Sequence, residues 1–192
     1  MSNRFTGIET PLKGLLELHR KPVGDERGFF ERLFCAEDMR EFGHPGVIAQ
    51  ANRSITKCKG TVRGMHFQYP PHGEWKLVTC LKGKVYDVAV DVRHNSPTFL
   101  KLHGIELSEE NHLSFLIPEG FAHGFQTLTE DCEMVYFASC AYCPSSEDGL
   151  RPDDPALAIN WPLPIRQMSE RDASHPLLTG IWQGVGGKER TH

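Results

Sequence analysis

Residues 76–93 read KLVTCLKGKVYDVAVDVR, and this stretch decides the fold. It consists of two apolar runs on either side of the pair Lys82-Gly83. In the second run, apolar residues alternate with Asp87 and Asp91, the pattern of a strand that buries one face and exposes the other. Because a glycine between two such runs is typical of a tight turn, the stretch predicts a β-hairpin with one buried face.

The same kind of pattern continues on both sides of this stretch. Short apolar runs are separated by the turn sequences SPT, SEEN, PEG and TED, and 18 Gly and 13 Pro are scattered among them. Short strands at such even spacing are typical of a β-sandwich or barrel. Strands are expected at 46–51, 61–68, 99–107, 112–117, 121–128 and 132–139, and one short helix is expected at 35–43.

The C-terminal part of the chain has a different composition. From Pro144 it becomes rich in Pro and Asp (PSSEDGLRPDDPALAINWPLP), and repeated prolines argue against central strands. We therefore expect a segment over about 145–180 that wraps around the body with short helical turns, followed by a frayed end at 183–192. A length of 192 residues favours one continuous core, so residues 1–192 are expected to form a single domain.

Charge and hydropathy disfavour several classes of function. The net charge is −4 and no basic run exceeds two residues, so we expect no nucleic-acid partner. No stretch approaches the ~20 apolar residues of a membrane span, and MSNRFTGIETPLKG lacks the apolar centre of a signal peptide. The protein is therefore expected to be cytoplasmic, with no membrane partner and with its six dispersed cysteines reduced.

Several short motifs that would indicate other chemistry are incomplete. Cys140-Ala-Tyr-Cys143 is a CxxC without the second pair of ligands that a zinc site needs. The chain also has no GxGxxG, no GxxxxGK[ST] and no GxSxG. These absences disfavour a Rossmann nucleotide site, a P-loop and an α/β-hydrolase nucleophile.

A series of motifs in a fixed order carries the strongest functional signal. The motifs are RGMHFQ (63–68), DVAVDVR (87–93), SPTF (96–99), IPEGFAHGF (117–125) and SERD (169–172). In this order and spacing, residues from about 10 to 178 closely resemble the dTDP-4-dehydrorhamnose 3,5-epimerase family. The resemblance implies a mainly β cupin jelly-roll sandwich with a few short helices, acting on a nucleotide sugar without a cofactor. It also implies a homodimer in which N-terminal strands are exchanged between subunits.

A metal-dependent cupin is the alternative within this fold. Residues 118–123, PEGFAH, match the second cupin signature PxGxxH. The first signature needs HxH followed by a Glu, whereas His66 stands alone, with Gln68 two residues later. Two isolated histidines do not complete a two-histidine, one-carboxylate site, so we expect no metal.

The chemistry of epimerisation defines three roles for side chains. A proton beside a ketone is removed from one face and returned to the other, through an enolate whose charge lies on the carbonyl oxygen. Histidine titrates near neutral pH and so suits the base. The resemblance implies His66 as the base, Asp172 as the carboxylate that orients it, Lys76 as the stabiliser of the enolate oxygen and Tyr136 as the acid on the opposite face. Without the resemblance, a structural histidine and a strand aromatic are the simpler interpretations of His66 and Tyr136, and a surface lysine at the start of a strand is as good an interpretation of Lys76 as a catalytic one.

Binding of a nucleotide diphosphate requires a few placed cations, because the chain has no phosphate loop. The resemblance implies Arg27, Arg63 and Arg171 for this role, since a guanidinium makes bidentate contacts with phosphate. A structural salt bridge is the alternative for Arg63. Contacts with the nucleotide or sugar are further implied for Gln50, Asn52, His123, Tyr142 and Glu147.

A few residues depart from the usual family pattern, in elements expected to contact the nucleotide. They are Arg32, Ala51, Ala141, Pro152 and Arg171. The expected substrate is a nucleotide-linked 4-keto-6-deoxy sugar of the dTDP-4-dehydro-6-deoxyglucose type, and a GDP- or CDP-linked sugar is the alternative. Inversion at C3, at C5 or at both stays open, and so does a non-catalytic sugar-binding cupin. An active enzyme would serve deoxysugar or polysaccharide synthesis, dTDP-rhamnose biosynthesis among them.

Overall fold

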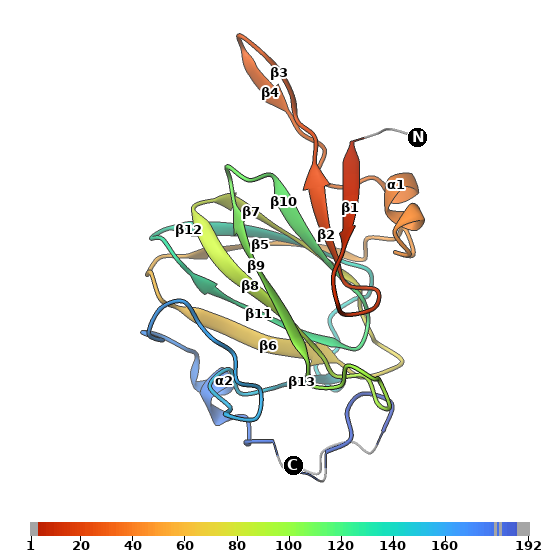
Figure 1. Ribbon diagram of the computed structural model, residues 1–192, viewed down its shortest axis with the longest axis vertical. Coiled ribbons are helices and arrows are strands. Elements are labelled where there is room, and N and C mark those ends of the chain that lie inside the picture. Colours follow the sequence, from red (N-terminus) through yellow and green to blue (C-terminus); the bar gives the residue numbers. More distant parts are fainter. Residues whose placement is uncertain (1–3, 179, 181, 188–192) are drawn as a thin grey trace.

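The protein is a sandwich of two antiparallel β-sheets (Figure 1) in the computed structural model, which describes residues 4–178, 180 and 182–187. Within these residues, one sheet has the order β1 (Phe5–Glu9), β2 (Leu16–Arg20), β10 (Leu113–Ile117), β7 (Lys76–Lys82), β12 (Cys132–Ala138) and β5 (Gln50–Thr56). The second sheet has the order β13 (Glu147–Gly149), β6 (Val62–Gln68), β11 (Phe121–Thr127), β8 (Lys84–Asp91) and β9 (Leu102–Ser108). The mainly β, cupin-type sandwich that we predicted is confirmed.

The stretch 76–93 forms two strands, but these strands do not pair with each other. β7 pairs with β10 and β12, whereas β8 pairs with β9 and β11 in the opposite sheet. The predicted β-hairpin is therefore wrong. Gly83 lies between the strands with φ of +75°, and there the chain passes from one sheet to the other. Two apolar runs around a glycine fit a hairpin turn within one sheet and also a connection between two sheets, so the pattern does not distinguish them.

β8 is buried on both faces, so the prediction of one buried face is also wrong. Val85 packs in the core between the sheets, and Val88 packs in a second apolar cluster that includes residues of the C-terminal tail. Asp87 and Asp91, expected on an exposed face, are both completely buried. Asp91 accepts hydrogen bonds from side chains of the turn that follows it, and Asp87 is paired with a histidine. Internal partners therefore allow these carboxylates to be buried.

Most of the other predicted strands lie within a few residues of their expected positions. They correspond to β6, β9, β10, β11 and β12, and the predicted helix corresponds to α1 (Ala36–Glu41). The strand expected at 46–51 is misplaced, because β5 runs over Gln50–Thr56. β1, β3 and β4 were not predicted; they are largely exposed and so lack an apolar pattern. β2 and β13 were also not predicted.

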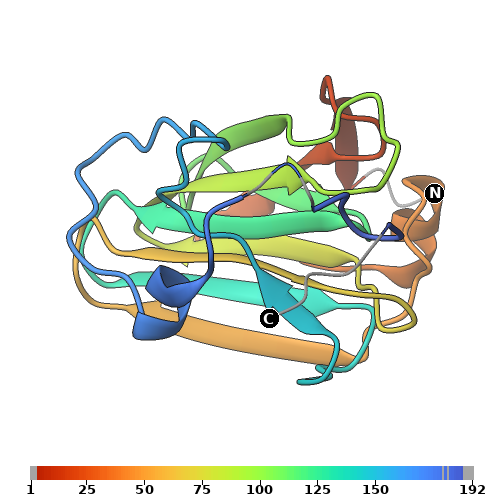
Figure 2. The same cartoon turned by 90° about the horizontal axis from the view of Figure 1, so that it is seen from below.

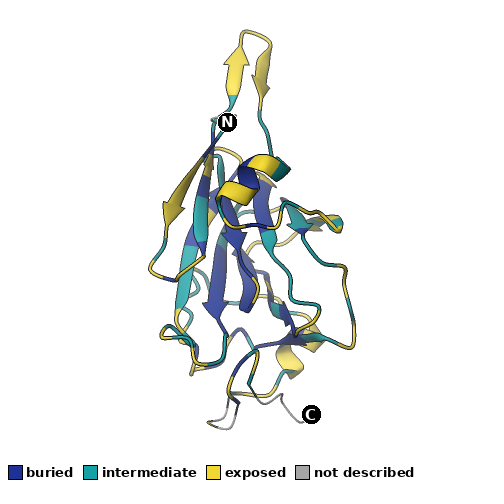
Figure 3. Cartoon of the chain, turned by 90° about the vertical axis from the view of Figure 1, so that its right-hand side faces the viewer, coloured by how far each residue is buried: buried dark blue, intermediate teal, exposed yellow. Residues whose placement is uncertain are grey.

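An arm formed by β3 (Val23–Asp25) and β4 (Gly28–Phe30) projects from the sandwich (Figure 3). All residues of its two strands are exposed, including Phe29 at 64% and Phe30 at 59%. Directly after the arm, the Glu31 carboxylate lies 3.3 Å from buried Arg20 and 2.8 Å from His112. These contacts fix the base of the arm while its tip stays away from the body.

The C-terminal tail wraps around the second sheet (Figure 2) and contains α2 (Glu170–Ser174). A frayed end was expected from residue 183, but Val185 forms backbone hydrogen bonds with Val92 and His94. The rest of that prediction, 188–192, lies outside the described residues. Neither of the described helices has the length and apolar composition needed to cross a membrane.

Candidate active site

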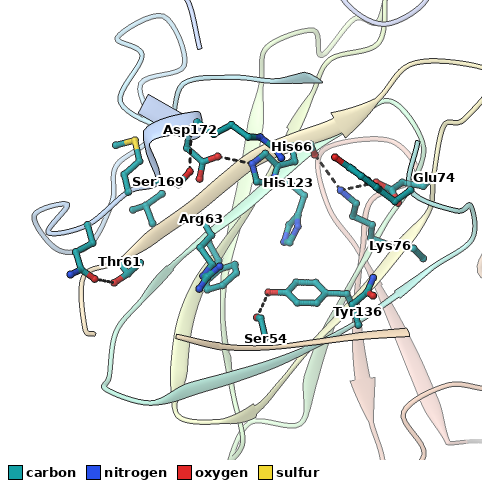
Figure 4. A pocket seen from close by; sticks show the side chains of 18 of the residues that line it. Ser54, Thr61, Arg63, His66, Glu74, Lys76, His123, Tyr136, Ser169 and Asp172 are labelled. Carbon is teal, nitrogen blue, oxygen red and sulfur yellow. Dashed lines mark hydrogen bonds and ion pairs between the residues drawn. The ribbon is translucent and has the colours of Figure 1, made fainter. Parts of the chain in front are cut away.

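A cavity of about 990 Å³ opens between the two sheets (Figure 4). Its walls come from β5, β7 and β12 of one sheet, from β6 and β11 of the other, and from the tail around the start of α2. Such a volume can hold a ligand of moderate size. The candidate residues that line it are Gln50, Asn52, Arg63, His66, Lys76, His123, Tyr136, Tyr142, Arg171 and Asp172.

His66 and Asp172 form a hydrogen-bonded pair on the cavity wall. His66 Nε2 lies 2.7 Å from Asp172 Oδ1, and the two side chains are 32% and 5% exposed. Asp172 is held in place by the cap of α2, because its backbone N–H donates to the Ser169 hydroxyl at 3.0 Å. Within the described residues, His66 Nδ1 has no hydrogen-bond partner. Asp172 can therefore orient the ring while Nδ1 accepts a proton.

The pKa of Asp172 reflects two opposing effects. Burial alone would raise this pKa, because it disfavours the charged form. The hydrogen bond and the charge of His66, with smaller contributions from Gly64 and Ser169, outweigh burial and hold the pKa below its ordinary value. Asp172 is consequently a carboxylate at neutral pH, as the orienting partner of a base must be.

Gly64 allows β6 and β11 to approach closely beside this pair. A Cβ atom at Gly64 would lie 2.5 Å from Gly124 Cα, and its φ is +119°, a conformation that favours glycine. The Gly64 N–H donates to Asp172 Oδ2 at 3.3 Å. The Gly64 N–H thus helps to hold the Asp172 carboxylate against β6, the strand that carries His66.

Lys76 begins β7 in the opposite sheet and extends into the same cavity. Its Nζ lies 3.0 Å from Glu74 Oε1 and donates to the backbone oxygen of His66 at 3.3 Å. The side chains of Lys76 and Glu74 are only 15% and 13% exposed, so the ammonium is held in one place. An ammonium has three N–H donors, which leaves one for an oxygen of a bound ligand.

Tyr136 lies on β12, in the sheet opposite His66. Its phenol oxygen is 2.9 Å from Ser54 Oγ, and its ring centroid is 6.2 Å from that of His123. Burial raises the pKa of Tyr136, while the hydrogen bond with Ser54 lowers it by a smaller amount. The phenol is therefore protonated at neutral pH and able to donate a proton.

A second histidine–carboxylate pair lies deeper in the protein. His123 Nε2 is 2.8 Å from Asp87 Oδ1, and the side chains are 7% and 0% exposed. His123 lies directly opposite His66 in the pairing of β11 with β6. Burial raises the pKa of Asp87, against the lowering effect of His123 and of the Lys76 ammonium. Its raised pKa distinguishes Asp87 from Asp172.

Four of the remaining binding candidates, Gln50, Tyr142, Glu147 and Arg171, form a hydrogen-bonded network. Glu147 does not line the cavity, but it accepts hydrogen bonds from the Tyr142 hydroxyl at 2.5 Å and from Arg171 Nη2 at 2.6 Å. Gln50 Oε1 accepts the backbone N–H of Tyr142 at 2.8 Å. Arg63 makes no ion pair with any other described residue, so the salt bridge considered as its alternative role is not found there. Its guanidinium thus remains available to an anion.

Arg27 is the candidate that lies apart from the cavity. It sits at the tip of the arm, its side chain is 85% exposed, and it is paired with Asp25. Arg27 therefore does not reach the cavity of its own chain, where most of the other candidates lie.

Sequence reasoning missed several residues of the site. Ser54 follows Asn52 by two residues in β5, so the period of a strand was a usable signal for it, whereas Glu74 lies in the irregular segment before β7. Arg166–Met168, in an irregular segment, gave no such signal. Across the residues that the structure describes, no group of three or more His, Cys, Asp or Glu side chains is arranged to hold a metal ion.

The fold and the site together define a class of protein. An interior cavity of a β-sandwich presents an oriented imidazole on one sheet, with an ammonium and a phenol on the other. A base, a cation and a proton donor in this arrangement are the groups that an enzyme needs to transfer protons at a carbon beside a carbonyl group. The chain belongs to the dTDP-4-dehydrorhamnose 3,5-epimerase family, whose profile matches residues 9–180, and it is therefore an isomerase.

Individual relatives agree with this membership. The dTDP-4-dehydrorhamnose 3,5-epimerase of Salmonella typhimurium is 44% identical over 173 residues, 89% of this chain and 94% of the relative. A dTDP-4-dehydrorhamnose 3-epimerase of Streptomyces niveus is 37% identical over 93% of this chain and 84% of the relative. The crystal structure of dTDP-6-deoxy-D-glucose-3,5-epimerase from Legionella pneumophila, in complex with dTDP-4-keto-L-rhamnose, matches with a TM-score of 0.85 and 41% identity, covering 92% of this chain and 94% of that one.

Proposed function

We propose that the protein epimerises dTDP-4-dehydro-6-deoxyglucose at C3, at C5 or at both, in a reaction of the dTDP-4-dehydrorhamnose type, through an enolate and without a cofactor. The observation that carries this proposal is the His66–Asp172 pair at 2.7 Å, facing Lys76 and Tyr136 in one cavity. The activities named for the Salmonella and Legionella relatives indicate the substrate.

Each of the four residues has one step. His66 removes the proton from the carbon beside the C4 ketone, and Asp172 stabilises the resulting imidazolium. The Lys76 ammonium stabilises the negative charge that develops on the C4 oxygen. Tyr136, on the opposite sheet, then donates a proton to the other face of the same carbon. The sugar ring is returned with the configuration of that carbon inverted.

The nucleotide diphosphate is bound by the remaining candidates. Arg63 and Arg171 supply guanidinium groups at the cavity, and the exposed ring of Tyr142 offers a flat face to a base. His123, Gln50 and Asn52 line the same cavity and supply polar contacts.

A homodimer with exchanged N-terminal strands would complete the site. The arm is exposed and carries apolar Phe29 and Phe30, which favours burial against a second copy. In such a dimer Arg27 could reach the cavity of the other subunit, which its position in one chain does not allow. We further propose that the chain forms a single domain and acts in the cytoplasm.

Proton NMR in deuterated water tests the activity. The protein is incubated with dTDP-4-dehydro-6-deoxyglucose, without added metal or nicotinamide, and deuterium is followed at C3 and C5 together with the configuration of the product. We expect incorporation at C3, C5 or both, accompanied by inversion. GDP- and CDP-linked 4-keto sugars, run in parallel, identify the nucleotide.

Two outcomes would contradict the proposal. Activity lost to a chelator and restored by a divalent cation would favour a metal-dependent cupin. Binding of the nucleotide sugars without any exchange would favour a non-catalytic sugar-binding protein.

A further inference from the structure

We propose that Ser54 is a positioning residue for Tyr136, fixing the phenol and stabilising the charge that it develops when it gives up its proton. This inference rests on the proposed function, in which Tyr136 is the acid. It adds a residue that neither the motifs nor the resemblance assigned.

Ser54 and Tyr136 reach the cavity from neighbouring strands of the same sheet. β5 and β12 pair with Tyr136 opposite Asn52, and Ser54 lies two residues further along β5. Residues two apart in a strand share a face, and all three side chains line the cavity. Ser54 Oγ therefore meets the phenol across a diagonal of the sheet, at 2.9 Å (Figure 4).

The Ser54 hydroxyl is the only hydrogen-bond partner of the phenol among residues 4–178, 180 and 182–187. Two rings cover the Tyr136 ring, with centroids 6.2 Å away for His123 and 6.5 Å away for Phe125. Burial raises the pKa of Tyr136, while Ser54 and, less strongly, the charge of Arg63 act in the opposite direction. A phenolate formed at this place would depend on Ser54 for its hydrogen bond.

The proton transfer explains why a hydroxyl is suited to this position. The Tyr136 O–H bond breaks, and its electron pair stays on the phenol oxygen. The π pair of the enolate forms the new C–H bond, while the C4 oxyanion becomes a ketone. The serine hydroxyl donates to the phenol oxygen, which leaves the single O–H of Tyr136 free to point at the enolate carbon, and it continues to donate to the phenolate after the transfer. Solvent water then returns a proton to the phenolate.

The test separates proton removal from proton return. In deuterated water, exchange without inversion reports removal and return on the same face, and inversion reports donation by Tyr136. For Ser54→Ala we expect inversion to slow by about 10- to 100-fold, the loss that accompanies removal of a hydrogen bond to a charged group. Exchange without inversion should change little. Ser54→Thr keeps the hydroxyl and should restore inversion.

A double-mutant cycle shows whether Ser54 acts through Tyr136. Tyr136→Phe and the double variant Tyr136→Phe/Ser54→Ala should invert at equal rates, within about a factor of two. Ser114→Ala is the matched control, because it removes a buried serine hydroxyl that lies 2.6 Å from Thr79 Oγ1 in the same sheet, outside the cavity lining. This control should leave the ratio of inversion to exchange unchanged.

Three results would overturn the inference. The first is a Ser54→Ala protein that slows exchange and inversion equally. The second is a further loss when Ser54→Ala is added to Tyr136→Phe. The third is a Ser54→Ala protein in which neither rate changes, while Tyr136→Phe lowers the ratio of inversion to exchange; this result leaves the proposed function intact. An unchanged ratio in Tyr136→Phe would instead contradict the role proposed for Tyr136, and the role of Ser54 with it.

Discussion

Two histidine–carboxylate pairs lie next to each other in this protein but differ in their access to water. His66 and His123 are directly opposite on β6 and β11, and each has a ring nitrogen less than 3 Å from a carboxylate oxygen. The His66 side chain is 32% exposed, whereas that of His123 is 7% exposed. Proximity to a carboxylate therefore does not by itself distinguish a base from a fixed polar contact.

The carboxylates show what the difference in burial does. Asp87 Oδ2 is buried and has no hydrogen-bond partner within the described residues, and burial raises the pKa of Asp87. Asp172 receives hydrogen bonds at both oxygens, and the pKa of Asp172 lies below its ordinary value. A lowered pKa keeps the charge that an imidazolium needs beside it. The His66 pair is thus suited to accept a proton, and the His123 pair is suited to hold a ring still.

The largest effect is expected from replacing the two histidines in turn. His66→Asn should lower kcat by about 10³- to 10⁴-fold and stop deuterium incorporation at every carbon, because no proton leaves without the base. His123→Asn should retain exchange and mainly raise KM. Exchange followed by NMR measures both variants. Loss of exchange in His123→Asn equal to that in His66→Asn would erase the functional distinction between the pairs.

Lys76 connects the two pairs and should give the next largest effect. Its ammonium donates to the His66 backbone and lowers the pKa of Asp87. Lys76→Met should reduce kcat by about 10²- to 10³-fold, because the ammonium acts on charge that develops during the reaction. The control is Lys84→Met, which removes a lysine paired with Glu106 at 3.0 Å outside the cavity lining. Unchanged kcat with raised KM in a correctly folded Lys76→Met protein would instead assign Lys76 to substrate binding.

A smaller effect on rate is expected from the carboxylates. Asp172→Asn should lower kcat by about 10- to 100-fold, because the imidazolium loses a charge-assisted hydrogen bond. Asp87→Asn should change kcat little, since the ring that it holds is not the base. Steady-state kinetics of the two variants measure the difference. Equal losses of kcat would show that both pairs take part in proton transfer.

Part of the fold could be predicted from the sequence because strand patterns are local. The alternation around Val88 locates β8, and the runs near 113–117 and 132–138 locate β10 and β12. Pairing is not local: β7 finds its neighbours in β10 and β12, far along the chain, and no pattern within 76–93 contains that information. For this reason the strands were found but the hairpin was not.

The same limit applies to the site. His66 and Asp172 could be proposed because family motifs carry them, although they are more than 100 residues apart. Asp87 could not be proposed, because its alternation with valines indicated that its side chain faces solvent. Only the pairing of β8 with β11 shows that the Asp87 carboxylate contacts His123. The place of Arg27 relative to the cavity depends on contacts beyond one chain, which neither its motif nor the fold of the single chain supplies.

The smallest expected difference between the two pairs is in how stability depends on pH. The contributions of Asp87 and Asp172 to the free energy of unfolding should change in opposite directions as pH rises. The pKa of Asp87 is raised above 3.8 in the folded protein, so the folded state binds more protons than the unfolded state just above that pH. The contribution of Asp87 to the free energy of unfolding therefore becomes less favourable as pH rises from 3.8 through the raised pKa of the folded state. The pKa of Asp172 is lowered below 3.8, so its stabilising contribution is complete above that pH and is lost as pH falls through the folded-state pKa.

Urea unfolding from pH 3 to pH 7 measures these signs as changes in the free energy of unfolding relative to the unsubstituted protein. Replacing Asp87 with Asn removes a buried group that is costly to ionise, so the Asp87→Asn protein should gain relative stability as pH rises. The Asp172→Asn protein should lose relative stability over the same change, because it lacks a favourable charge that the unsubstituted protein acquires. Since Asn matches Asp in size, both variants keep the packing of the site. Parallel slopes for the two variants would mean that burial does not dominate at Asp87, and the contrast between the pairs would then rest on exposure of the histidines alone.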